Sequence, residues 1–195
     1  MKHFRKLNAR RVCVLAGCVL VVAALVWAGV WYGSAAVYAS RCQAYTQTLR
    51  KAMPPIQSAV PEARTDNRMP VLSAEGKDFI GLIQFPAYNA ELPVCDDWGT
   101  PSRYPCRFTG SAYDGTLVIG STDRTGQMDF AEMLSVGDTV YLTDVTGARY
   151  AYRITDIQIS AHADRETLCA GEGKLTLFVK NTMGFDYRII RCEVG

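Results

Sequence analysis

One apolar stretch near the N-terminus constrains this chain more than any other feature. Residues 12–32, VCVLAGCVLVVAALVWAGVWY, contain no charged side chain. An α-helix rises about 1.5 Å per residue, so a stretch of this length spans a hydrocarbon core about 30 Å thick. Trp27, Trp31 and Tyr32 lie towards its C-terminal end, and such aromatic side chains favour the headgroup region. The stretch therefore predicts one transmembrane helix.

The charges before this helix predict its orientation. Five basic residues and no acidic residue precede it: Lys2, Arg5, Lys6, Arg10 and Arg11. The positive-inside rule then places residues 1–11 in the cytoplasm and the rest of the chain outside, as a single-pass protein of the plasma membrane. A cleaved signal peptide is the alternative, because small residues occur at 34–36. Its apolar region would usually be only about 7–15 residues long.

The charges after the helix argue against a nucleic-acid partner. Without the five N-terminal basic residues, 16 Lys and Arg stand against 19 Asp and Glu, a net charge of −3. A nucleic-acid-binding domain usually carries clustered Lys and Arg. We therefore expect the membrane, reached through the N-terminal helix, as a partner and no nucleic acid.

Five cysteines lie beyond the apolar stretch, where an oxidising compartment would permit disulfides. Cys95 and Cys106 flank a loop that contains Gly and Pro, and they are the pair that we expect. Cys169 with Cys192 is a second option, and the odd number leaves one thiol free. Because no C-x-x-C pair and no Cys/His cluster occurs, we expect no metal site and no cofactor.

The rest of the chain changes character near residue 75. Residues 33–74 predict a juxtamembrane helix, stopped by Pro54 and Pro55, and then a linker that contains Pro61. Residues 75–195 contain short runs rich in β-branched and aromatic residues, typical of strands. Strands are expected at 79–85, 92–94, 116–119, 139–143, 150–154, 175–179 and 187–192, with a short helix at 130–134. Many short strands with one small helix indicate a closed β-barrel.

The order of these segments resembles that of sortases, the membrane-anchored cysteine transpeptidases of Gram-positive bacteria. Residues 80–86, IGLIQFP, and 90–94, AELPV, resemble the opening strands of that family. Residues 116–120, TLVIG, and 136–140, VGDTV, resemble the strand before the catalytic histidine and the start of the next strand. LTLFVKNT at 175–182 and YRII at 187–190 resemble the strands that carry the catalytic cysteine and arginine. The resemblance implies a mainly β, sortase-like closed β-barrel with one or two short helices, preceded by the transmembrane helix.

The resemblance also implies three catalytic groups. A cysteine thiolate attacks a peptide carbonyl, a histidine moves the proton, and an arginine stabilises the oxyanion. Arg188 occupies the arginine position, but Lys180 stands at the cysteine position and Ser121 at the histidine position. The histidine found beyond the helix, His162, is expected on an exposed loop. Two of the three catalytic groups are therefore absent.

Three roles stay open for Lys180. In a vestigial site its ammonium group would be solvated at a strand end. In a binding cleft Lys180 and Arg188 would together hold a carboxylate, supplied by Asp123, by Asp186 or by a ligand. In a Ser–Lys dyad, Ser121 would be the nucleophile and Lys180 the base.

These roles correspond to two classes of function. We expect a sortase-family protein of the cell surface, a pseudoenzyme that binds a peptide or a sorting-signal segment of surface proteins. The alternative is an active transpeptidase or peptidase that attaches or processes surface proteins by means of Ser121 and Lys180. The sequence leaves open whether the chain is an enzyme.

Overall fold

The computed structural model describes residues 9–60, 66–101, 103–170 and 173–195. Lys2, Arg5, Lys6 and Pro61, which entered the predictions above, lie outside the described residues. The chain divides into two compact units, Met1–Val37 and Tyr38–Gly195.

The first unit is the N-terminal part of a long helix. Helix α1, Ala9–Ala52, is continuous over 44 residues. Within it, Val12–Val30 is long and apolar enough to cross a membrane, judged by length and composition. None of this segment is buried in the structure. The structure thus contains the expected apolar N-terminal helix, which by length and composition could cross a membrane.

The second unit includes the last turns of α1. Cys42, Tyr45 and Leu49 are buried, and their spacing of three and four residues places them on one face of the helix. The ring of Tyr45 lies 5.0 Å from the ring of Phe79. The helix ends before Pro54, because proline lacks the N–H group that an α-helix requires.

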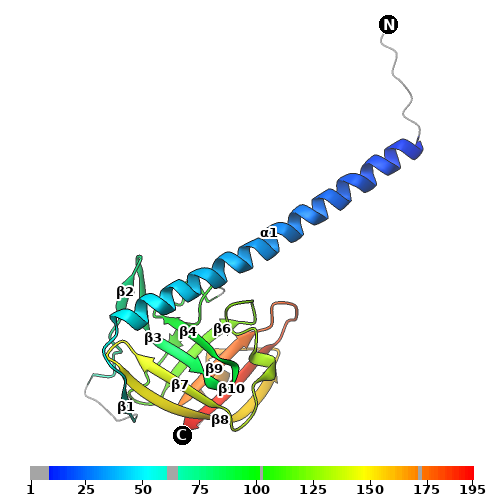
Figure 1. Cartoon of the computed structure of the whole chain (residues 1–195). Coiled ribbons are helices and arrows are strands. Elements are labelled where there is room, and N and C mark those ends of the chain that lie inside the picture. Colours follow the sequence, from blue (N-terminus) through cyan, green and yellow to red (C-terminus); the bar gives the residue numbers. More distant parts are fainter. Residues whose placement is uncertain (1–8, 61–65, 102, 171–172) are drawn as a thin grey trace. The chain divides into compact units, whose positions relative to one another are not determined.

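The remainder of this unit is built around a single sheet (Figure 1). Among the described residues the sheet has ten strands: β1 (Gln57–Ala59), β2 (Leu72–Ala74), β3 (Lys77–Phe85), β4 (Ala90–Cys95), β5 (Cys106–Thr109), β6 (Leu117–Thr122), β7 (Thr139–Asp144), β8 (Ala148–Ser160), β9 (Leu175–Lys180) and β10 (Tyr187–Val194). Strands β3 to β10 close into a barrel in the order β8–β10–β9–β6–β5–β4–β3–β7, and β7 returns to β8. The predicted mainly β closed barrel is therefore confirmed.

Successive side chains along the strands pack into different hydrophobic clusters, which distinguishes the two faces of the sheet. On β9, Leu177 and Val179 belong to the large core cluster, whereas Phe178 belongs to a smaller cluster with Leu168 and Ile189. Successive side chains of a strand point to opposite faces, so the larger cluster marks the inner face of the barrel and the smaller one an outer face.

Several elements differ from the expected pattern. Strands β1 and β2 lie in the segment expected to be a linker, and β5 and β8 are new or longer than expected. The helix expected at 130–134 is one 3-10 turn, η2 (Ala131–Met133), and a second such turn, η1 (Pro86–Tyr88), follows β3. A short helix, α2 (Arg165–Cys169), follows β8; the side chain of Asp164 accepts a hydrogen bond of 2.7 Å from the backbone N–H of Thr167 and caps it.

Candidate functional site

Three strands bring the expected site residues to one end of the barrel. Strands β6 and β9 run parallel, with Thr122 paired to Lys180. Strand β10 runs antiparallel to β9, with Tyr187 paired to Lys180 and Arg188 paired to Val179. Arg188 is therefore adjacent to the end of β9, as the sequence predicted.

The register places Lys180 and Arg188 on opposite faces of the sheet. Residues directly opposite each other on neighbouring strands share a face. Arg188 shares the inner face with Val179, whereas Lys180 shares the outer face with Tyr187. The structure thus does not bring the two cations together as the binding-cleft hypothesis expected, because their positions in the register differ by one residue.

Arg188 lines a small pocket that is rich in acidic residues. Its volume is about 30 Å³, and Asp123, Glu132 and Asp186 line it together with Arg188. This volume corresponds to roughly one water molecule, which is too small for a peptide side chain of ordinary size. Three carboxylates beside one guanidinium group also disfavour a second anion here. The sequence analysis proposed Asp123 and Asp186 as carboxylate partners, and both line this pocket together with Arg188.

Ser121 is buried and already bonded. Only 4% of its surface is exposed, and its hydroxyl group donates to Oε1 of Gln127 at 3.2 Å. The hydroxyl of Thr122 donates to the same oxygen at 3.0 Å. Because Ser121 pairs with Val179 and not with Lys180, its side chain lies on the face opposite to Lys180. This arrangement does not form a Ser–Lys dyad.

Lys180 stands at the edge of an aromatic shelf on the outer face. The shelf consists of Trp98, Phe108 and Phe178, whose ring centroids lie 5.0–5.6 Å apart. Phe178 precedes Lys180 by two residues, so both side chains lie on the same face, about 7 Å apart along the strand. Trp98 keeps 37% of its surface exposed. An exposed ammonium group thus lies next to a partly exposed apolar surface.

The connection between β9 and β10 presents two apolar side chains to solvent. Met183 is 90% exposed and Phe185 is 97% exposed. The backbone between them is held by Asn181, whose side-chain oxygen accepts hydrogen bonds from the N–H groups of Met183 at 3.0 Å and Gly184 at 2.9 Å. Asp123 fixes the start of the connection by accepting two hydrogen bonds from Thr182. The two large apolar groups are therefore displayed on an ordered turn next to Lys180.

Cys169, Cys192 and His162 all lie outside the strand end that holds Lys180. Cys192 pairs with Leu175 at the opposite end of β9, roughly 16 Å from Lys180 along the strand. Cys169 ends α2 and is exposed. His162 is exposed on the loop after β8, as predicted. Because β8 extends to Ser160, which pairs with Tyr187, this loop begins at the same end of the barrel as Lys180.

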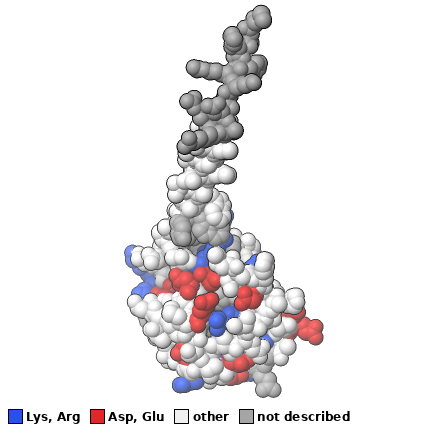
Figure 2. Space-filling view, turned by 90° about the vertical axis from the view of Figure 1, so that its right-hand side faces the viewer, with Lys and Arg blue, Asp and Glu red and all other residues white. Residues whose placement is uncertain are grey.

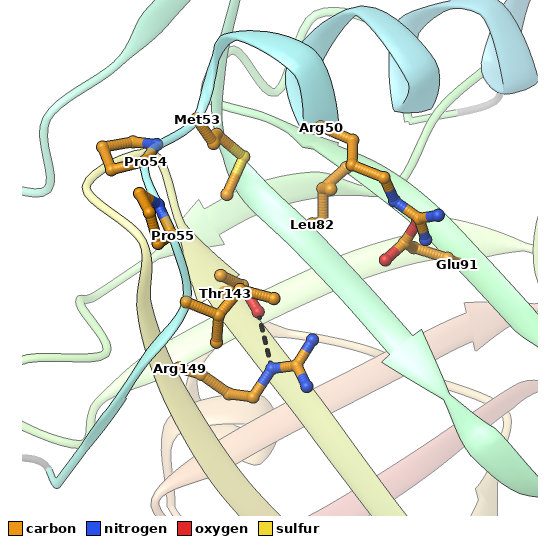
Figure 3. A pocket seen from close by; sticks show the side chains of 9 residues that line it. Arg50, Met53, Pro54, Pro55, Leu82, Glu91, Thr143 and Arg149 are labelled. Atoms are coloured by element: carbon orange, nitrogen blue, oxygen red, sulfur yellow. Dashed lines mark hydrogen bonds and ion pairs between the residues drawn. The ribbon is translucent and has the colours of Figure 1, made fainter.

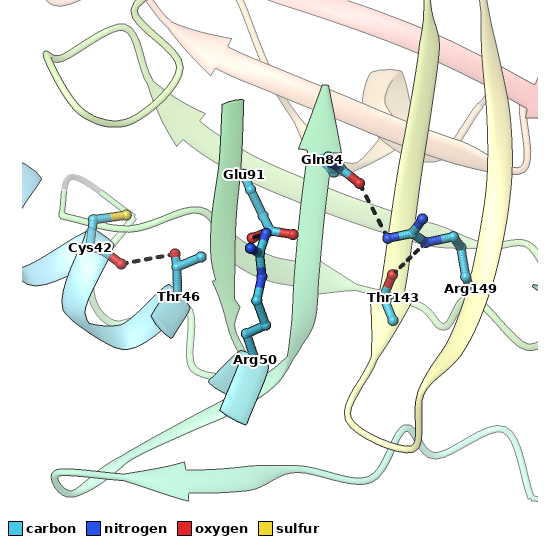
Figure 4. A network of polar contacts seen from close by, with 7 residues as sticks. All are labelled: Cys42, Thr46, Arg50, Gln84, Glu91, Thr143 and Arg149. Carbon is cyan, nitrogen blue, oxygen red and sulfur yellow. Dashed lines mark hydrogen bonds and ion pairs between the residues drawn. The ribbon is translucent and has the colours of Figure 1, made fainter. Parts of the chain in front are cut away.

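A larger cavity lies elsewhere, beside the end of α1 (Figure 3). Its volume is about 350 Å³, within the range of small-molecule sites. Arg50 forms an ion pair with Glu91 at its wall (Figure 4). Arg149 donates to the hydroxyl of Thr143 at 3.1 Å and to the side-chain oxygen of Gln84 at 3.2 Å. Motif order and spacing did not predict this cavity, because residues distant in sequence form it.

The distribution of charges and of metal-binding side chains does not indicate a further site. Figure 2 shows acidic and basic side chains intermixed on one face of the barrel unit. Among the described residues, no group of three or more His, Cys, Asp or Glu side chains could hold a metal ion. Neither Lys180 nor Arg188 forms an ion pair within the described part of the chain.

Comparisons with known proteins bear on the fold. No protein-family model matches the sequence, and no curated protein is significantly similar to it. Among solved structures, sortase A from Corynebacterium diphtheriae matches with a TM-score of 0.52 and 17% identity, over 83% of this chain and 84% of that chain. Sortase C1 from Streptococcus agalactiae matches with a TM-score of 0.53 and 15% identity, over 63% and 70% of the two chains.

A third similar structure contains a peptide motif. Clostridium perfringens sortase C, solved with the C-terminal cell wall sorting motif, matches with a TM-score of 0.51 and 17% identity, over 67% of this chain and 78% of that chain. Identities this low establish the fold alone. The resemblance seen in the order of the motifs is confirmed at this level: the chain has the sortase fold.

Proposed function

We propose that this chain is a membrane-anchored member of the sortase family whose barrel lies at the cell surface and binds a peptide segment without cysteine transpeptidation. The observation that carries the proposal is the exposed Lys180 at the end of β9, where the motif resemblance expects the catalytic thiol. The apolar segment Val12–Val30 supplies the anchor, and the basic residues before it favour a cytoplasmic N-terminus.

Lys180 cannot take over the chemistry of a thiolate. A peptide carbonyl transferred to an amine gives an amide, which is as stable as the bond that was broken and does not turn over. Loss of the nucleophile in a catalytic triad costs on the order of a million-fold in rate. The site therefore supports binding better than acyl transfer by the cysteine route.

The surroundings of Lys180 favour a peptide that carries both an acidic and an apolar group. The ammonium group would form a charge-assisted hydrogen bond with a carboxylate. Trp98 offers apolar surface on the same face, and Phe185 is exposed on the turn that follows. Large exposed apolar side chains next to a polar group are typical of interaction sites. The sorting motif in the similar Clostridium perfringens structure supports a peptide as the class of ligand.

The alternative, peptide cleavage by a Ser121–Lys180 dyad, has less support. Ser121 is buried, donates to Gln127 and lies on the face opposite to Lys180. A general base must come within hydrogen-bonding reach of the hydroxyl that it activates. A dyad would require β6 or β9 to shift its register by one residue here.

The proposal is tested by binding of two labelled peptides to the full-length protein in detergent. The peptides share apolar residues and differ by one Asp replaced by Asn. We expect the Asp peptide to bind more tightly, and Lys180→Ala to weaken its binding by about 1.5–5-fold, the range of an exposed ion pair. Added salt should reduce the preference, because exposed charges are screened.

Lys174→Ala is the matched control, since Lys174 is also exposed but lies at the opposite end of β9. We expect this variant to bind like the unmodified protein. Equal binding of both peptides, or equal weakening by both lysine variants, would contradict the proposed site.

A further inference from the structure

The closed barrel has one seam that is much thinner than the others. Strands β4 and β5 share a single residue pair, Cys95 with Cys106. The other neighbours in the ring share three to eight pairs. The backbone adds one hydrogen bond of 2.8 Å, donated by the N–H of Cys95 to the carbonyl of Pro105. Little regular pairing therefore closes the barrel between β4 and β5.

The two cysteines at this seam are placed to bond to each other. Cys95 is the last residue of β4 and Cys106 the first of β5, and both are buried free thiols in one core cluster. Neighbouring strands lie roughly 5 Å apart, which is within the range of Cα separations that disulfides span. The contact with Cys106 lowers the pKa of the Cys95 thiol, and the same contact together with burial raises the pKa of Cys106.

We propose that Cys95 and Cys106 form a disulfide that closes the barrel at its thinnest seam and fixes the segment carrying Trp98 over the outer face beside Lys180. The bond does not depend on which ligand the protein binds, but the inference rests on the part of the proposed function that places the barrel outside the cell, where disulfides persist. It also gives a structural reason for the pair that the sequence suggested from its flanking loop.

The oxidant in this reaction is a disulfide donor, either a small molecule or a thiol–disulfide oxidoreductase. The Cys95 thiolate attacks a donor sulfur, forming a mixed disulfide and releasing the first donor thiolate. Cys106, after losing its proton, attacks the Cys95 sulfur of the mixed disulfide and releases the second donor thiolate. The protein loses two electrons and two protons, and the donor becomes two thiols. Cys95 is the first nucleophile because its lower pKa gives it the larger thiolate fraction.

The bond would affect the outer face of the barrel, because Trp98 lies between the two cysteines in sequence and its position depends on this segment. The Trp98 ring packs on Phe108 at 5.0 Å and on Phe178 at 5.5 Å. The buried ring of Tyr104, 5.5 Å from the ring of Tyr45, holds the connection near Cys106. Near Cys95, Asp96 forms an ion pair with Arg107 at 2.5 Å. Both of these side chains are partly exposed, so the ion pair holds the connection only weakly. A covalent link at the seam would keep Trp98 on the shelf.

Peptide mapping of the full-length protein tests the bond. The protein is purified in detergent with oxidised glutathione, alkylated under denaturing conditions and digested with trypsin. Arg103 lies between the cysteines, so trypsin separates residues 78–103 from residues 104–107. We expect these two peptides to be linked and to separate after reduction. The exposed Cys169 should be alkylated in the same sample.

The variants complete the test. The linked peptides should persist in Cys169→Ser and disappear in Cys95→Ser. Reduction of the unmodified protein should lower the midpoint of thermal unfolding of the barrel by about 6–12 °C, the effect expected for a loop of this length. Alkylation of both Cys95 and Cys106 in the oxidised sample, or a link from either one to another cysteine, would overturn the proposal.

Discussion

Gly120 leaves little room for a side chain on the outer face of β6. A Cβ atom added there would lie 2.4 Å from the Trp98 ring and 2.5 Å from the Phe178 ring. Gly120 therefore permits the close approach of the aromatic shelf to β6. Without that approach Trp98 would not cover the strand next to the Lys180 position.

Gly120→Ala should therefore destabilise the barrel. We expect the free energy of unfolding to fall by about 1–3 kcal/mol, as for other overpacked sites, because both rings must move. Urea unfolding of the purified protein measures this change. Gly33→Ala is the control, since no atom lies within 4 Å of a Cβ added at Gly33. Equal stability of Gly120→Ala and the unmodified protein would show that the shelf does not pack on β6 as described.

For single residues, the sequence predicted their places along the strands better than the face of the sheet to which their side chains point. The order of the motifs correctly placed Arg188 next to the end of β9. It did not predict that Lys180 and Arg188 face opposite sides of the sheet. The face to which a side chain points depends on the register of two strands joined by a turn. A shift of one residue moves the side chain to the other face. The bonding of Ser121 to Gln127 was equally out of reach, because it depends on how the following turn folds back.

Among the elements, α1 contains the apolar segment that could cross a membrane and also contributes to the core of the second unit. Its residues Val12–Val30 are apolar, whereas Tyr45 and Leu49 are buried against the barrel. The charges before the anchor predict that the barrel lies outside the cell.

Protease added to intact cells should therefore digest the barrel, while an epitope tag placed before residue 1 stays protected. Quantitative blotting against both ends measures this. A cytoplasmic protein of the same cells serves as the control for lysis. Protection of the barrel together with loss of the tag would reverse the predicted orientation.

The strands differ in how well the pattern of apolar residues predicted them. Apolar or alternating runs such as LTLFV predicted β9 and β10 closely. Strands β1, β2 and β5 are only three or four residues long, so no period could be detected in them. Strand β8 continues to Ser160, beyond the expected 150–154, with Ile159 exposed on its far half. The exposure of this half of β8 depends on tertiary packing and not on the local pattern of apolar residues.

At the scale of the whole molecule, the closed barrel was predictable because the order of many weak motifs is more specific than any one of them. The resulting sortase fold does not decide activity, since folds host many functions. We propose that this chain keeps the fold for binding and has lost the cysteine chemistry. The groups at the end of β9, an exposed Lys180 and a buried Ser121, carry that claim.

Cleavage of fluorogenic peptides of the sorting-motif type tests this claim most directly. The full-length protein is assayed with and without prior alkylation of its thiols, alongside Lys180→Ala and Ser121→Ala. We predict no cleavage above the rate without protein in any sample, because no thiolate stands at the strand end. Cleavage that alkylation abolishes would contradict the account by revealing a cysteine nucleophile. Cleavage that survives alkylation but disappears in both variants would instead establish the Ser121–Lys180 dyad.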